Sequence, residues 1–116
     1  MPLVYVTTSK KCADSAKQAT VLALSKMCAK VIGKPESYVQ VIINDSATAS
    51  FGGQIAEAAF VVVKSIGGLN NSVNSTLCAE ICACLQEKIG IAPDKVYIQL
   101  SDVKASEFGW NSSTFG

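Results

Sequence analysis

The sequence predicts a single domain of the α/β or α+β class, in which two βαβ units form a four-stranded mixed sheet with both helices on one face. Two observations predict this fold. A strand–helix–strand pattern occurs twice in the 116 residues, at about 2–45 and 59–102. The two copies also align at an offset of 57 positions, which pairs Val4 with Val61. A right-handed crossover in each copy places both helices on the same side of the sheet.

The first copy begins with the run LVYVTT at 3–8, whose β-branched and aromatic residues predict a strand. A helix is expected over 14–32, because apolar side chains recur there at helical spacing. Gly33 ends this helix and Pro35 prevents its continuation. The run YVQVII at 38–43 predicts the next strand. The inward stripe of the helix is expected to contain Val21, Leu24, Cys28 and Val31.

The second copy repeats this order after a turn predicted by FGG at 51–53. The run AFVVVKS at 59–65 predicts a strand, and IGGLNN at 66–71 predicts a loop. A helix follows over about 72–88, and KVYIQLS at 95–101 predicts the fourth strand. The inward positions of this helix are Val73, Leu77, Ile81 and either Cys84 or Leu85, and Gly90 ends it. The aromatic tail EFGWNSSTFG is expected to pack back locally.

One face of the predicted sheet lacks a cover within the chain. The run FVVV is apolar on consecutive residues, so both faces of its strand favour burial. Charged residues make up only 16% of the chain, against roughly 25% in ordinary domains. Two helices cover one face, so we expect the other face to meet further copies of the chain.

Composition excludes several classes of function. The net charge of +1 without a basic run gives no nucleic-acid footprint, and no apolar run approaches the ~18 residues that span a bilayer. The amino end lacks a signal-peptide pattern, so a cytoplasmic location is expected. Histidine is absent, which removes Ser–His and Cys–His nucleophile pairs. The five cysteines lack zinc-site spacing, so buried thiols are favoured over a metal site or a disulfide, and no cofactor is indicated.

Pro2 is the first candidate catalytic residue. Proline is tolerated at the start of a strand, which is its structural interpretation. Removal of the methionine before it would instead leave a free secondary amine. Desolvation and a nearby cation both lower the pKa of an amine, because both disfavour its charged form. An amine that is neutral at pH 7 can act as a general base.

Lys34 and Ile66 are the candidate anion-binding residues. Lys34 follows a helix C-terminus, where a cation is favourable in any protein. The end of a helix in a βαβ unit also lies near the start of the preceding strand, so Lys34 is expected near Pro2. Ile66 lies in SIGG, between a strand and a helix, where backbone N–H groups can bind an anion. As a bare motif SIGG is a turn.

These stretches together resemble the macrophage migration inhibitory factor family of the tautomerase superfamily. The resemblance rests on the initial Met-Pro, IGKPESYV (32–39), FGG (51–53), SIGG (65–68), PDKVYI (93–98) and GWNSSTF (109–115). It covers essentially the whole chain in order. It implies a homotrimer with helices outside a central barrel. It also implies keto–enol tautomerase activity on phenylpyruvate, 4-hydroxyphenylpyruvate or a dopachrome ester.

The resemblance also assigns roles to residues. Pro2 would be the catalytic base, while Lys34 and the Ile66 N–H would bind the carboxylate of a keto or enol acid. An aromatic pocket would be lined by Tyr38, Tyr97, Phe108, Trp110 and Phe115, with Tyr97 reaching in from a neighbouring subunit.

Three departures from the family pattern bear on activity. The positions of the C-x-x-C of vertebrate members are occupied by Ala58 and Val61, so thiol oxidoreductase activity is not expected. Gln99 stands where an active-site asparagine is usual, and Phe108 replaces a smaller aliphatic residue.

A cytokine-like signalling protein, which binds a receptor and keeps the site as a vestige, is the alternative function.

Overall fold

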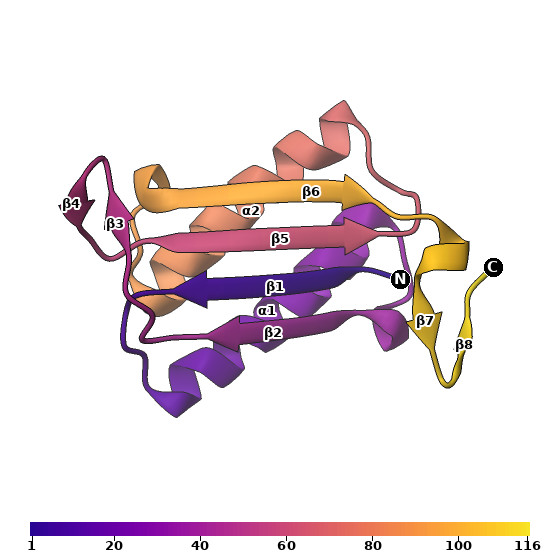
Figure 1. Cartoon of the computed structure of the whole chain (residues 1–116), viewed down its shortest axis with the longest axis horizontal. Helices are drawn as coiled ribbons and strands as arrows, with labels where there is room; N and C mark the ends of the chain where they lie inside the picture. The colour runs from indigo at the N-terminus through magenta and orange to yellow at the C-terminus, as the bar shows by residue number, and fades with distance from the viewer.

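Four long strands form one sheet in the order β2-β1-β5-β6 (Figure 1). The computed structural model describes residues 1–116. The strands are β1 (Leu3–Thr8), β2 (Gln40–Asn44), β5 (Ala59–Ser65) and β6 (Val96–Asp102). The β1–β2 and β5–β6 pairs are parallel, whereas β1 and β5 are antiparallel. The mixed four-stranded sheet predicted from the sequence is therefore confirmed.

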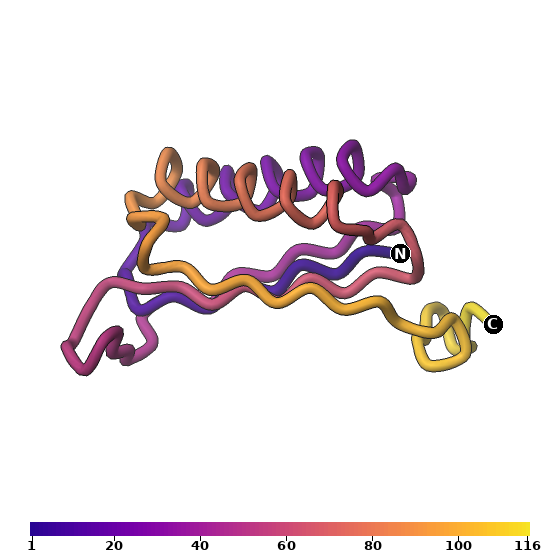
Figure 2. The backbone as a smooth tube through the Cα atoms, turned by 90° about the horizontal axis from the view of Figure 1, so that it is seen from above, coloured from indigo at the N-terminus to yellow at the C-terminus, as the bar shows by residue number.

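Helices α1 (Asp14–Ile32) and α2 (Asn71–Ile89) lie side by side on one face of this sheet (Figure 2). Each helix has 19 residues, and their bounds differ by 57 positions. Each ends at a glycine in the left-handed conformation, Gly33 with φ 79° and Gly90 with φ 71°. Glycine adopts this conformation without a steric penalty, which explains why both helices stop where the sequence predicts.

The hydrophobic core fills the space between the helices and the sheet. It contains Val4, Val6, Leu24, Cys28, Ile32, Val61, Val63, Leu77, Ile81 and Leu85, among others. Of the two candidates on α2, Leu85 is fully buried and Cys84 is only partly buried. Of the expected stripe on α1, Leu24 and Cys28 are buried and the half-buried Val31 packs against the core, whereas Val21 does not belong to the core. The buried row follows steps of four residues through Thr20, Leu24, Cys28 and Ile32.

The predicted second strand begins too early. Tyr38 lies in the 3₁₀ turn Glu36–Tyr38, and its N–H donates to the carbonyl of Pro35 over 3.1 Å. The Val39 N–H donates to Glu36 in the same way, so β2 starts only at Gln40. The 3₁₀ turn Pro93–Lys95 occupies the same place before β6.

Two short hairpins lie at opposite ends of the sheet (Figure 1). The first, β3 (Ser50–Phe51) with β4 (Gln54–Ile55), turns at the predicted FGG. The second, β7 (Gly109–Trp110) with β8 (Ser113–Thr114), follows the 3₁₀ turn Ala105–Glu107 near the N-terminus. The Phe115 N–H donates to the Phe108 carbonyl over 3.0 Å, so the tail packs back locally, as predicted.

The face of the sheet away from the helices is uncovered and partly apolar (Figure 2). Tyr5, Phe60 and Tyr97 lie on it with 39%, 46% and 68% of their surface exposed. Side chains along β5 alternate between buried and more exposed positions, so the strand presents Phe60 and Val62, followed by Lys64, on the uncovered face. Neither helix is both long and apolar enough to cross a lipid bilayer.

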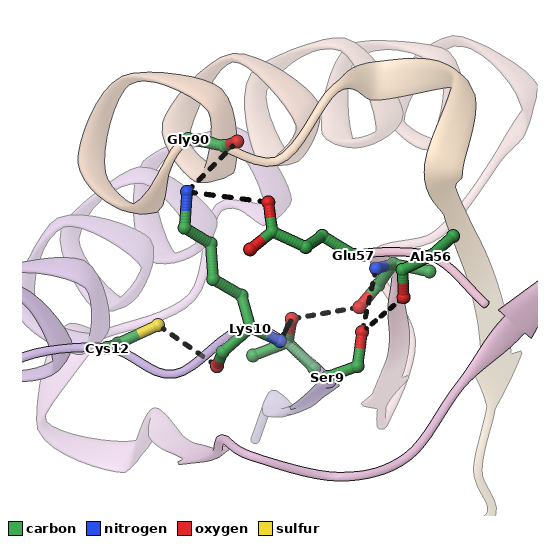
Figure 3. A network of polar contacts seen from close by, with 8 residues as sticks. Ser9, Lys10, Cys12, Ala56, Glu57 and Gly90 are labelled. Atoms are coloured by element: carbon green, nitrogen blue, oxygen red, sulfur yellow. Dashed lines mark hydrogen bonds and ion pairs between the residues drawn. The ribbon is translucent and has the colours of Figure 1, made fainter.

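The sheet end opposite the N-terminus is closed by polar contacts (Figure 3). The Ser9 hydroxyl donates to the Ala56 carbonyl over 2.7 Å and accepts the Ala58 N–H over 3.0 Å. The Lys10 ammonium donates to the carbonyl of Gly90 over 3.5 Å and lies 3.9 Å from the Glu57 carboxylate. The loop after β1 is thus tied to the end of α2.

Candidate active site

Pro2 lies immediately before β1, at the edge of the sheet where β1 and β2 begin. Its carbonyl accepts the Gln40 N–H over 3.1 Å, at the first residue pair of the two parallel strands. Pro2 is fully buried. Strand pairing and burial therefore fix the position of the Pro2 nitrogen, and the environment disfavours a charge there.

A cavity of about 500 Å³ opens at Pro2. Its lining includes five of the predicted site residues, namely Pro2, Tyr38, Phe108, Trp110 and Phe115. Volumes of roughly 300–1,000 Å³ are usual for small-molecule sites. A larger hollow of about 700 Å³ lies between α1 and α2, where its ionisable groups are the exposed Lys26, Lys30 and Glu80. Size alone therefore does not distinguish the two hollows, and we take the one at Pro2 as the candidate site because a buried proline lies there among aromatic rings.

The aromatic side chains of this cavity contact one another. The Trp110 and Phe115 rings are stacked with centroids 6.0 Å apart and an interplanar angle of 10°. The Tyr38 ring meets both edge-on, at 5.4 Å from Trp110 and 6.2 Å from Phe115. Phe108 lies 5.9 Å from Phe115. Aromatic pairs at these distances and angles are favourable, so the tail forms a stable wall.

Lys34 lies at the same end of the sheet, just after the end of α1. A Cβ atom on Gly67 would be 3.8 Å from the Lys34 Nζ, so the ammonium lies against the loop that contains Ile66. Burial, and secondly the positive charge of Lys34, lower the pKa of the Met1 α-amino group. Both effects disfavour the protonated form of an amine. The prediction that Lys34 lies near the amino end thus agrees with the geometry.

The loop at Ile66 offers an unpaired backbone donor. The N–H of Ile66 donates to no protein acceptor, whereas the Gly67 N–H donates to the Asp102 carboxylate over 2.9 Å. Ile66 is half-buried. A free N–H beside a lysine can bind an oxyanion, because both groups contribute positive potential. Neither Lys34 nor Ile66 lines the Pro2 cavity within the single chain.

Tyr97 and Gln99 lie elsewhere. Tyr97 pairs through Phe60 with Thr7, five residues along β1 from Pro2, or about 17 Å at the usual rise of a strand. Its ring packs on Phe51 at 5.2 Å. Gln99 is exposed on the uncovered face of the sheet. The single chain therefore does not bring these two residues to Pro2, and their roles remain predictions that require a neighbouring subunit.

Sequence reasoning missed other polar residues at this end. Ser37 and Gln40 line the cavity with polar side chains, and Asp102 anchors the loop at 66–68. Gln40 could have been found from its place at the start of the strand beside Pro2. The repeat could have indicated Asp102, because it stands 57 positions after Asp45.

The cysteines form no part of this site. All five are free thiols, and Cys28 is buried in the core. Burial, with a smaller contribution from Cys84, raises the pKa of Cys28 to about 12, so this thiol stays protonated at neutral pH. The structure contains no group of three or more side chains suited to hold a metal ion.

Comparisons with known proteins agree with this geometry. The sequence model of the macrophage migration inhibitory factor family matches residues 1–116. A macrophage migration inhibitory factor homologue of Trichinella spiralis is 34% identical over 115 residues, which cover 99% of this chain and all of the relative. The structure of a homologue from Prochlorococcus marinus superposes with a TM-score of 0.94 at 33% identity, over 98% of this chain and 99% of that one. A related protein from Entamoeba histolytica gives 0.93 at 30% identity, over 98% of both chains. The chain therefore belongs to the macrophage migration inhibitory factor family.

Proposed function

We propose that this protein is a keto–enol tautomerase that acts on phenylpyruvate-like 2-keto acids, with Pro2 as the general acid and base once Met1 is removed. The observation that carries the proposal is the position of Pro2. It is buried and lines an aromatic cavity, and Lys34 lies at the same end of the sheet. Burial and Lys34 lower the pKa of the adjacent Met1 α-amino group, and the same causes would lower the pKa of a Pro2 amine.

In the proposed reaction the substrate ring lies among Tyr38, Trp110 and Phe115, and its carboxylate lies toward Lys34 and the Ile66 N–H. The lone pair of the Pro2 nitrogen accepts a proton from the carbon next to the keto group. The electrons of that C–H bond form the enolate. Lys34 and the Ile66 N–H stabilise its negative charge. The protonated nitrogen then returns the proton to the enolate oxygen, which completes the enol and regenerates the neutral amine. Proton transfer of this kind contributes about 10²–10⁴-fold to the rate.

We also infer that the active assembly is a homotrimer. The exposed apolar residues of the uncovered sheet face support an assembly, because such surface is costly in water. The family resemblance supports three subunits. In this arrangement Tyr97 reaches the Pro2 cavity of a neighbouring subunit, which would explain why the residue lies far from Pro2 within its own chain.

The Pro2→Gly variant tests the base assignment. Glycine also permits removal of Met1, so the variant keeps an α-amino group but replaces the secondary amine with a less basic, more flexible primary one. We expect the rate of phenylpyruvate tautomerisation to fall at least tenfold, because general acid–base catalysis contributes about 10²–10⁴-fold. Intact-mass spectrometry must show that Met1 is absent from both proteins, and gel filtration must show the same assembly. Unchanged turnover in the processed variant would refute the assignment.

A further inference from the structure

Three hydrogen bonds fix the loop at 66–68. The Ser65 hydroxyl donates to the carbonyl of Gly67 over 2.7 Å, and the Gly67 N–H donates to the Asp102 carboxylate over 2.9 Å. The Val103 N–H donates to the carbonyl of Ser65 over 2.9 Å. Ser65 is wholly buried, whereas Asp102 ends β6 and is exposed. The direction of the free Ile66 N–H therefore depends on contacts that its two neighbours make with the end of β6.

The same loop packs closely against the segment from Ile32 to Lys34. Gly68 has φ 82°, and a Cβ atom on it would lie 2.7 Å from the Ile32 Cγ2 and 3.3 Å from the Lys34 Cε. Only glycine fits a backbone with this conformation at so close a distance. A shift of the loop would therefore also disturb the surroundings of the Lys34 side chain, so the two anion-binding groups are positioned together.

The repeat contains a counterpart of Asp102 with a different role. Asp45 stands 57 positions earlier, directly after β2, and its carboxylate accepts the Cys12 N–H in the loop after β1 over 2.8 Å. Asp45 also forms an ion pair with Lys17 at 3.4 Å, whereas Asp102 forms none. Each βαβ unit thus ends in an aspartate that holds the loop of the neighbouring parallel strand. The loop held by Asp102 presents the free Ile66 N–H beside Lys34, which forms no ion pair.

We propose that Asp102 is a positioning residue for the substrate carboxylate, and that it makes the site select acids over the corresponding esters. This inference rests on the proposed tautomerase function. Asp102 accepts the Gly67 N–H and so holds the Ile66 N–H and Lys34 in one orientation toward the carboxylate. An acceptor oxygen at this position is sufficient for that role, and its negative charge is not required.

The test compares phenylpyruvate with its methyl ester in the Met1-processed protein. For Asp102→Ala we expect the KM for the acid to rise about tenfold with little change in kcat, because a hydrogen-bonded anchor of a charged ligand is lost. The ester should keep both constants, since it has no carboxylate to bind. Asp102→Asn keeps the acceptor oxygen and should behave like the wild type. Asp45→Ala removes the matching anchor at the other end and should leave both KM values unchanged.

Equal losses on the acid and the ester, or no loss on either, would overturn the positioning role. If the wild-type protein converts neither compound, the proposed function fails, and the inference is then tested by binding. Inert 3-phenylpropionate, titrated into ¹⁵N-labelled protein, should shift the Ile66 amide signal in the wild type and Asp102→Asn but not in Asp102→Ala. An Ile66 signal that does not respond in the wild type, or that responds equally in Asp102→Ala, would overturn the inference.

Discussion

The two ends of the sheet are built from equivalent parts of the repeat, but one is closed and the other is open. At the closed end the loop after β1 meets the end of α2, where Lys10 contacts both Gly90 and Glu57 (Figure 3). At the open end the loop after β5 meets the end of α1, where Lys34 lies against Gly67 without an acidic partner. Lys10 therefore has a carbonyl and a carboxylate as partners, whereas Lys34 has no ion pair and can bind an anion.

One difference between the two ends is a backbone hydrogen bond that joins the loop after one strand to the residue before the neighbouring strand. At the closed end the Ser9 N–H donates to the Ala58 carbonyl over 3.1 Å, directly before β5. The residues 57 positions from these two are Ile66 and Met1. The Ile66 N–H makes no such bond, and the proposed removal of Met1 would delete the only carbonyl in the equivalent position. The candidate site therefore lies where the Ile66 N–H has no acceptor, and where the proposed removal of Met1 would take away the carbonyl that corresponds to that of Ala58.

The position after each helix differs as well. Gly33 is followed by Lys34, whereas Gly90 is followed by Ile91, which is fully buried in the core. The second half thus has a buried apolar side chain where the first half has a half-buried cation. The residue after the helix-ending glycine is therefore a second difference between the structural corner and the candidate anion site.

Exchange of the two lysines for alanine should separate the ends most clearly. We expect Lys34→Ala to lower kcat/KM on phenylpyruvate by about 10–100-fold, because a charge-assisted contact to the carboxylate is lost. The loss of a cation should also raise the pKa of the Pro2 amine, so the acidic limb of the pH–rate profile should move to higher pH. Lys10→Ala should change neither quantity. Equal effects of both variants would contradict the distinction between the ends.

Tyr97 tests whether a neighbouring subunit completes the open end. We expect Tyr97→Ala to reduce kcat/KM about three- to tenfold, since it removes one aromatic contact of the pocket. Tyr97→Ala and Pro2→Gly subunits, unfolded together and refolded, should form mixed assemblies that are more active than the mean of the two pure variants. Such assemblies contain some sites with both residues intact. Activity equal to that mean would place Tyr97 outside the site.

Asp45 should affect the stability of the closed end without affecting catalysis. The hydrogen bond from the Cys12 N–H, and further the Lys17 charge, lower the pKa of Asp45. A carboxyl group with a lowered folded-state pKa stabilises the protein above its unfolded pKa, near 3.9, and loses this contribution as the pH falls through the folded value.

The Asp45→Asn variant should therefore unfold in less urea than the wild type at pH 6. The gap between the two urea midpoints should narrow as the pH falls below about 4, because the Asp45 carboxyl becomes protonated first in the unfolded chain and then, at its lowered pKa, in the folded protein. Tautomerase activity serves as the control and should be unchanged. A gap that stays constant down to pH 2 would show that the charge of Asp45 contributes nothing to stability.

The sequence predicted the fold better than the site. Periodicity and the glycines at 33 and 90 located both helices, because each signal acts within a few residues. The expected stripe on α1 was wrong at Val21, since the tilt of a helix on its sheet depends on packing from outside the helix.

The candidate site was predictable only in part. The buried proline and the aromatic tail follow from local patterns, and the structure brings them together. The anchor at Asp102 depends on the pairing of the end of β6 with the end of β5, which no short stretch of sequence encodes. Tyr97 and Gln99 lie on the uncovered face, so their roles depend on an assembly.

A titration of the Pro2 nitrogen by ¹⁵N NMR, in protein that mass spectrometry shows to lack Met1, measures the decisive quantity. We predict a pKa below the ~7.7–8.0 of an ordinary α-amino group, which shifts upward when Lys34 is replaced by alanine. A Pro2 nitrogen that remains protonated well above pH 8, or whose pKa is the same in the Lys34→Ala variant, would contradict a catalytic base at the open end.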